Sequence, residues 1–160
     1  PYYAYGSKEL YSTNLQNQQN RLDALENQEQ TDENTEKYIE QALASIAKWR
    51  EKLDMMNLYT DFSGKKEMPE IAFEAHIRLE SFVDTDYSAY VAVQSEVQRA
   101  VTELRDEEAE SLFGTTWTTM NRYIIQNELE DTPELRQYKK HTELIETLYP
   151  LRLIEVKPKR

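Results

Sequence analysis

The stretch "IEQALASIAKWREKLDMM", residues 39–56, carries the strongest periodic signal in the chain. Apolar residues recur in it at alternating spacings of three and four, which places them on one face of a helix. These residues are Ile39, Ala42, Ile46, Trp49, Leu53 and Met56. Leu43 widens the stripe beyond a simple coiled-coil seam. We therefore expect an amphipathic helix that packs against more than one neighbour and buries Trp49.

The residues around this stretch predict where its helix begins and ends. "TDENTEKY", residues 31–38, offers Thr31 or Asp32 as an N-cap, and the following acids suit the positive end of the helix dipole. "DFSGKK", residues 61–66, contains Gly64, a residue type that commonly ends helices. A helix is therefore expected between these two signals.

An earlier helix is expected from Ser7 onward, after a lead-in of residues 1–6. Its heptad core positions hold Tyr11, Leu15, Leu22 and Leu25, and Gln18 and Glu29 interrupt the seam. "MPEIAFEAHIRLESFV", residues 68–83, predicts a further helix with Pro69 in its first turn.

A long helix is predicted from Tyr87 to Leu112, with Asp84 or Asp86 as its cap. Its apolar positions are expected to point inward: Tyr90, Val93, Val97, Val101 and Leu104. A last helix is expected from "DTPELRQ", residues 131–137, with Thr132 before Pro133 or Asp131 as the cap. Pro150 should end it, and residues 151–160 form an extended tail, a short strand or a connector.

"LFGTTWTTMNRYIIQ", residues 112–126, interrupts this helical pattern with a glycine and several hydroxyl residues. Gly114 suits a left-handed helix end, and Thr115 or Thr116 suits the cap of the next helix. The stretch is therefore interpreted as a joint with Trp117 facing the core. The alternative is a ligand pocket lined by Thr116, Trp117 and Thr119, because a helix break beside an aromatic residue can hold a small polar molecule.

The composition favours helices over sheets. The 160 residues are 39% apolar and 31% charged, with only three glycines and five prolines. Tight turns of an all-β protein use glycine heavily. We therefore predict an all-α fold: one domain, residues 1–160, built as an elongated, mostly antiparallel bundle of four to six helices.

The net charge of −11 argues against binding to nucleic acid or to an anionic membrane surface. No apolar run is long enough to span a bilayer. Cysteine is absent, which excludes disulfides and thiolate chemistry and hints at a location outside the cytoplasm. The first residue is Pro1 and not methionine, so a processed chain or a fragment is expected.

"ELRDEEAES", residues 103–111, concentrates acidic residues in two helical turns. They are Glu103, Asp106, Glu107, Glu108 and Glu110. One interpretation is a docking patch for a basic partner or a weak cation site, and the ordinary one is a solvated helix face. We refer to these five residues as the acidic patch.

No other motif carries recognisable chemistry. His76 and His141 lie far apart on separate predicted helices and belong to no metal-binding spacing. "DTDYSAYVAVQS", residues 84–95, lacks the glycine and the final glutamate of a calcium loop. No catalytic residue, cofactor or metal site is therefore predicted.

The expected function is a non-enzymatic binding module, namely the extracytoplasmic helical domain of a secreted or membrane-anchored protein that docks a partner or ligand. The alternative is a cytoplasmic or virion assembly protein that forms homo-oligomers through its helices. A hydrolase with a carboxylate pair is the remaining hypothesis, because thirty acidic residues leave such a pair unassigned.

Overall fold

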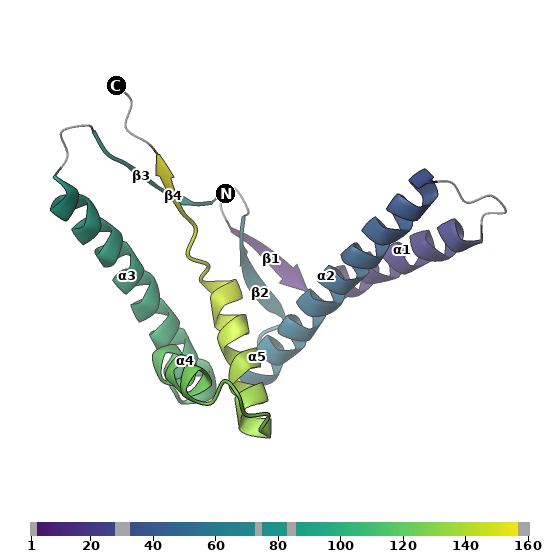
Figure 1. Cartoon of the computed structure of the whole chain (residues 1–160). Coiled ribbons are helices and arrows are strands. Elements are labelled where there is room, and N and C mark those ends of the chain that lie inside the picture. Colours follow the sequence, from purple (N-terminus) through teal and green to yellow (C-terminus); the bar gives the residue numbers. More distant parts are fainter. Residues whose placement is uncertain (1–2, 28–32, 73–74, 83–85, 157–160) are drawn as a thin grey trace. The chain divides into compact units, whose positions relative to one another are not determined.

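The structure, a computed structural model, describes residues 3–27, 33–72, 75–82 and 86–156 (Figure 1). In these ranges the chain is mostly helical, with five helices and four short strands. It divides into two compact units. Unit 2 is Tyr5–Pro69, and unit 1 comprises Pro1–Ala4 and Glu70–Arg160. The single domain expected from the sequence stays a prediction.

Unit 2 is built on two long helices, α1 (Lys8–Glu26) and α2 (Glu33–Ser63), which pack side by side (Figure 1). The Ser7 hydroxyl caps α1 by accepting a hydrogen bond from the Leu10 N–H at 3.2 Å. The proposed caps of α2, Thr31 and Asp32, lie outside the described residues, as does Glu29. Gly64 follows α2 with a φ of 69°, so it ends this helix as predicted.

The interface of α1 and α2 buries fewer residues than the stripe of 39–56 predicts. Tyr11, Ala42, Ile46 and Met56 are buried. Trp49 is only partly buried, and Leu43 is 51% exposed, so both expectations for these side chains need correction. The reason is that α2 packs on one helix within unit 2, so part of its stripe is left uncovered.

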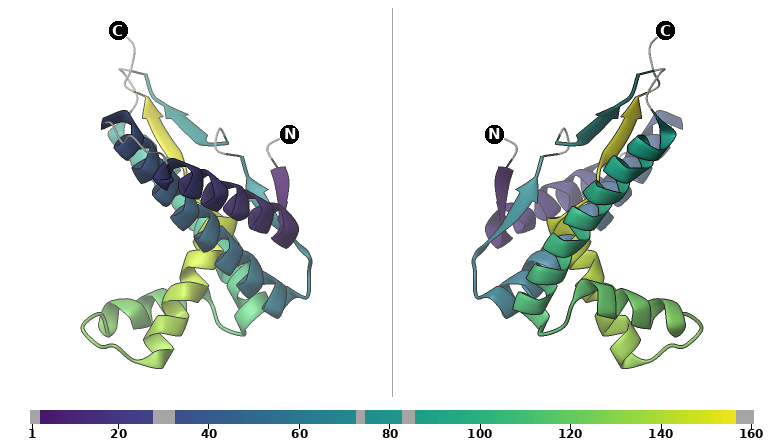
Figure 2. Two further views of the ribbon diagram at one scale, coloured as in Figure 1. Left: turned by 90° about the vertical axis from the view of Figure 1, so that its right-hand side faces the viewer. Right: turned by 90° about the vertical axis from the view of Figure 1, so that its left-hand side faces the viewer.

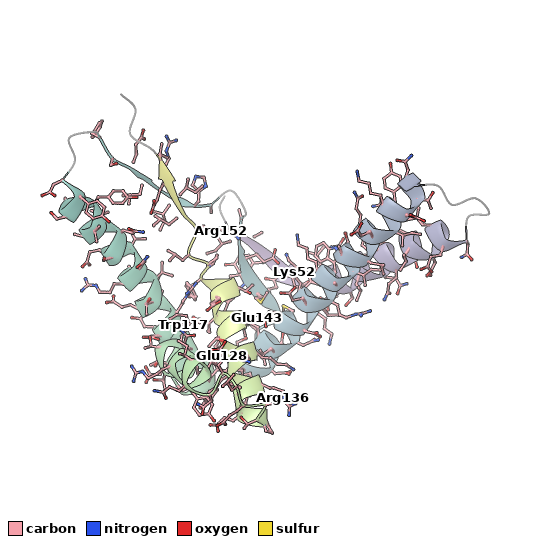
Figure 3. The ribbon with its side chains drawn as sticks, in the orientation of Figure 1. Lys52, Trp117, Glu128, Arg136, Glu143 and Arg152 are labelled. Atoms are coloured by element: carbon pink, nitrogen blue, oxygen red, sulfur yellow. The ribbon has the colours of Figure 1, made fainter. Side chains whose placement is uncertain are left out.

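Tyr11 and Lys52 are neighbours of the Trp49 ring. The Tyr11 and Trp49 ring centroids are 6.0 Å apart. Lys52 lies on α2 (Figure 3), and its ammonium is 5.4 Å from the first centroid and 5.3 Å from the second, a cation–π arrangement. Trp49 therefore packs with one face and leaves part of its indole in solvent.

Unit 1 contains α3 (Tyr87–Phe113), α4 (Trp117–Gln126) and α5 (Pro133–Leu148), with α3 packed on both others. Asp86 caps α3 through the Ser88 N–H at 2.9 Å, and Asp84 lies outside the described residues. Thr132 caps α5 before Pro133, as one of the two predicted alternatives requires. The buried apolar side chains of these helices are Ala109, Met120, Leu135, Leu144, Ile145 and Leu148.

The prediction of a helix over residues 68–83 is wrong. The chain forms the strands β2 (Glu67–Ile71) and β3 (Ile77–Glu80) there. Strand β1 (Tyr3–Ser7) occupies the expected lead-in and pairs with β2, and β4 (Leu153–Val156) lies in the tail. The all-α description is therefore incomplete, because two small sheets accompany the helices.

The pairing of β3 with β4 shows why few glycines did not exclude strands. These strands are parallel, with Ile77 opposite Leu153 and Glu80 opposite Val156 (Figure 2). Parallel strands are joined by a long crossover, here α3, α4 and α5, and not by a tight turn. A two-residue hairpin with glycine is therefore not required.

Candidate functional site

The predicted acidic patch on α3 separates into internal and external members. Asp106 accepts hydrogen bonds from the Thr118 N–H at 2.7 Å and the Thr118 hydroxyl at 2.9 Å. Glu108 accepts one from the Tyr149 hydroxyl at 3.2 Å. Two of the five carboxylates thus hold α3 to α4 and to the end of α5. The other three members of the acidic patch are exposed and remain candidates for docking a partner: Glu103, Glu107 and Glu110.

The residues of the predicted ligand pocket form the joint between α3 and α4. Gly114 adopts a φ of 69° at the end of α3, and its N–H donates to the Glu110 carbonyl at 3.0 Å. Thr116 caps α4 by accepting from the Thr119 N–H at 3.2 Å. The Thr116 and Thr119 hydroxyls also lie within hydrogen-bonding distance, 2.8 Å apart. Both hydroxyls are therefore used by the joint itself.

Trp117 lies at the start of α4 (Figure 3), and the guanidinium of Arg105 lies over its indole ring. The Arg105 Cζ is 5.0 Å from the indole centroid, and its Nε donates to the Tyr149 carbonyl at 2.9 Å. Burial lowers the pKa of Arg105 and the nearby Glu146 raises it, so partial desolvation dominates. The indole Nε1 is buried and donates no hydrogen bond to the described residues.

His141 belongs to the packing beneath this joint. It is 4% exposed, and its ring stacks on Phe113 with centroids 3.8 Å apart and planes 7° from parallel. Burial lowers the pKa of His141, so the neutral imidazole is favoured. His76 is not helical as predicted, because it precedes β3 and is exposed. The structure does not place the two histidines in one cluster.

The joint as a whole has the character of a structural connection. Its carboxylates, hydroxyls and guanidinium are engaged with neighbouring helices, and these contacts fix the angle at which α4 leaves α3. Sequence reasoning correctly identified the glycine and the threonine cap. It missed Arg105 as the partner of Trp117, because a cation twelve positions earlier on another helix has no local signature.

The exposure of side chains along α3 differs from that expected from the sequence. Val93 and Leu104, which were expected to point inward, are 48% and 47% exposed. Ala100 is exposed and Val97 is partly buried. Spacings of four, three and four place Val93, Val97, Ala100 and Leu104 on one face of the helix. We refer to these four residues as the α3 seam.

Burial on α3 is confined to another face because α4 and α5 cover only its C-terminal part. Ala109 is the buried residue of this helix among those described. Nearer the N-terminus, Gln94 donates to Glu155 of β4 at 3.1 Å, and desolvation, followed by the charge of Glu155, raises the pKa of Tyr90. Neighbours within unit 1 therefore contact one side of α3 and leave Val93, Ala100 and Leu104 of the seam exposed.

Three glutamates flank the seam on one side: Glu96, Glu103 and Glu110. They recur at intervals of seven residues and are exposed. Arg99 contacts Glu96 and also lies 3.8 Å from Glu103, but these groups are about two-thirds exposed, so such pairs contribute little to stability. Glu110 forms no ion pair with a described residue. We refer to the three residues as the acidic flank.

The β3–β4 sheet adds further exposed apolar surface to unit 1. Ile77 is 43% exposed and Ile154 is 47% exposed. Parallel sheets usually have both faces covered, so a bare pair of parallel strands is uncommon. Arg152, on the segment before β4, donates to the Ala72 carbonyl and secures this segment (Figure 3).

Other classes of site find no support in the described part of the chain. It contains no cluster of three or more histidine or acidic side chains arranged to hold a metal ion. No helix in the described ranges combines the length and apolarity needed to cross a membrane. Comparisons with protein-family models, with curated proteins and with solved structures find no significant match.

Proposed function

We propose that this chain is a non-enzymatic interaction module that docks a protein partner on the α3 seam. The single observation that carries the proposal is the exposure of Val93 and Leu104 in a row at helical spacing. Isolated apolar residues on a surface are ordinary. A row with the period of a helix-packing face is typical of a surface that another helix covers.

Docking on the α3 seam would remove apolar side-chain area from water. Fully burying a valine or leucine side chain stabilises a protein by about 1.5–3 kcal/mol. Val93 and Leu104 are about half exposed, so docking would recover roughly half of that amount for each. A partner therefore gains affinity without any rearrangement of α3.

The proposal also includes the extracytoplasmic location and the bundle architecture that are expected from the sequence. A chain without cysteine suits an extracytoplasmic domain of a secreted or membrane-anchored protein. A helix laid along α3 would extend the helices of unit 1 toward the elongated, mostly antiparallel bundle expected from the sequence. The seam would then supply the coiled-coil contact.

Unit 2 favours a second candidate, self-assembly through the long helices. Leu10 is 49% exposed, Tyr38 46% and Leu43 51%, so apolar side chains of α1 and α2 also remain in solvent. This corresponds to a cytoplasmic or virion assembly protein that forms homo-oligomers. Sedimentation of the chain across the micromolar range distinguishes the two, since docking of a different protein predicts a monomer.

The docking proposal is tested by the size of the complex that the full-length protein forms in extracts of its native cells. The double variant Val93→Asp with Leu104→Asp should move the protein to the elution volume of its free form. Val91→Asp is the matched control, because Val91 is 37% exposed on a different face of α3. An unchanged elution profile for the double variant, with an unchanged melting temperature, overturns the proposal.

A further inference from the structure

We infer that the partner is a basic amphipathic helix that lies along the α3 seam and sets lysine or arginine side chains against the acidic flank. This inference rests on the proposed docking function and names the chemistry of the partner. It follows from the charge beside the seam, from the small residue within the seam, and from the poor fit of a second copy of the chain.

The seam has the spacing of a coiled-coil core. Val93, Val97, Ala100 and Leu104 follow one another by four, three and four residues, which are alternating core positions of a heptad. In that register Glu96 and Glu103 occupy the flanking position directly before the core residues Val97 and Leu104, and Glu110 continues the same row one heptad beyond the end of the seam. Residues at such positions select a partner by charge.

Acidic side chains beside the seam and just beyond its end favour a basic partner. Arg99 offsets part of the charge of Glu96 and Glu103, but it lies among exposed groups that exchange partners easily. Glu110 and the neighbouring Glu107 have no ion pair in the described ranges. An arriving lysine or arginine can therefore pair with them without breaking an existing contact.

Ala100 adds a constraint on shape. It is the smallest side chain of the seam and lies between Val97 and Leu104. A small residue at a core position allows the two helix axes to approach or accepts a large side chain from the partner. The partner is therefore expected to carry leucine, isoleucine or methionine opposite Ala100.

A second copy of the chain fits the seam poorly. In an antiparallel pair the acidic flanks of both copies would face each other, and like charges there oppose association. In a parallel pair the flank would face positions equivalent to Gln94, Val101 and Glu108. Gln94 and Glu108 are already hydrogen-bonded to Glu155 and Tyr149. Acidic residues also outnumber basic ones in both units.

The first test uses two synthetic 21-residue helical peptides with leucine at the core positions. One carries lysine at the flanking positions and the other carries glutamate. We expect the lysine peptide to bind the full chain at least ten times more tightly than the glutamate peptide. This preference should weaken as salt is raised, because exposed charges are screened. A scrambled lysine peptide of identical composition should not bind.

Charge reversal provides the decisive comparison. Glu103→Lys with Glu110→Lys should lower the affinity for the lysine peptide at least tenfold and raise it for the glutamate peptide. Glu128→Lys with Glu130→Lys is the matched control on the exposed connection after α4, and it should leave both affinities unchanged. Leu104→Asp should abolish binding of both peptides, and melting curves establish that each variant is folded.

The results separate this inference from the proposed function. If Val93→Asp with Leu104→Asp leaves the native complex intact, the docking function itself is overturned. If those changes disrupt the native complex but reversal of Glu103 and Glu110 does not, only the basic helix is overturned. Equal binding of the lysine and glutamate peptides, or self-association of the chain through the seam, also overturns it.

Discussion

The Asp106 carboxylate accepts two hydrogen bonds from Thr118, one from its N–H at 2.7 Å and one from its hydroxyl at 2.9 Å. Asp106 lies on α3 and Thr118 in the first turn of α4, so this pair fixes the angle between the two helices. The carboxylate also satisfies an N–H at the start of α4, where the helix has no backbone acceptor of its own.

Asp106→Ala should lower the free energy of unfolding by about 1.5–3 kcal/mol, the range for hydrogen bonds to a charged group. Thr118→Val should cost less, since it keeps the N–H bond. Glu107→Ala, which changes an exposed acidic neighbour, is the control and should shift stability by less than about 0.5 kcal/mol. Chemical denaturation measures all three, and equal losses for Asp106 and Glu107 would contradict the structure.

Gly114→Ala should destabilise the chain by about 1 kcal/mol. The cause is the φ of 69°, because a Cβ built on this glycine meets nothing within 4 Å. Gly64 has the same φ and the same open surroundings, so Gly64→Ala should cost a similar amount. Asparagine at position 114 should cost less, since it tolerates this conformation. A stabilised Gly114→Ala variant would mean that α3 continues through the joint.

The stability of unit 1 should depend on pH through His141. Burial lowers the pKa of this histidine from its ordinary 6.5 in the folded chain. The unfolded chain then binds the proton more readily, so stability is fully present above about pH 6.5 and decreases as the pH falls toward the lowered value.

Denaturation at a series of pH values between 7.5 and 5 measures this dependence. His141→Phe keeps a ring against Phe113 and should flatten the curve in that interval. His76→Gln changes the exposed histidine and should leave the curve as it is. A slope that survives His141→Phe would show that another group is responsible.

Replacement of the two neighbouring aromatic residues of unit 2, Tyr11 and Trp49, should lower the free energy of unfolding by unequal amounts. Tyr11 is 1% exposed, so Tyr11→Ala should approach the 3–5 kcal/mol that is roughly typical of a truncated core aromatic ring. Trp49 is only partly buried and should cost less, in contrast to the full burial expected from its stripe. Denaturant midpoints of the two variants test the order, and a larger loss for Trp49 would reverse it.

The helices of this chain can be predicted from the sequence where capping residues, helix-ending glycines and apolar periodicity agree. Caps such as Ser7, Thr116 and Thr132, and the glycines at 64 and 114, act through neighbouring backbone groups, so their patterns identify helix ends directly. Apolar periodicity between those signals gave the extents of α2 and α3 to within a few residues.

Local patterns do not predict the strands β1, β2 and β3, because their partners are distant in sequence, and β4 is only one of three alternatives for residues 151–160. β3 pairs with β4 across three helices, and no local pattern reports that contact. Apolar periodicity also does not distinguish a stripe that is buried within the chain from one that stays exposed. Val93 and Leu104 have the spacing of core residues, yet unit 1 leaves them exposed.

The most direct test of the α3 seam is site-specific photo-cross-linking of the full-length protein in its native cells. A photoreactive amino acid replaces Leu104 in one variant and Val91, on a different face of the same helix, in another. We expect a protein adduct at position 104 that is missing at position 91, with the cross-linked residues in a lysine- or arginine-rich helix. No adduct at position 104, or equal adducts at both positions, would contradict this expectation.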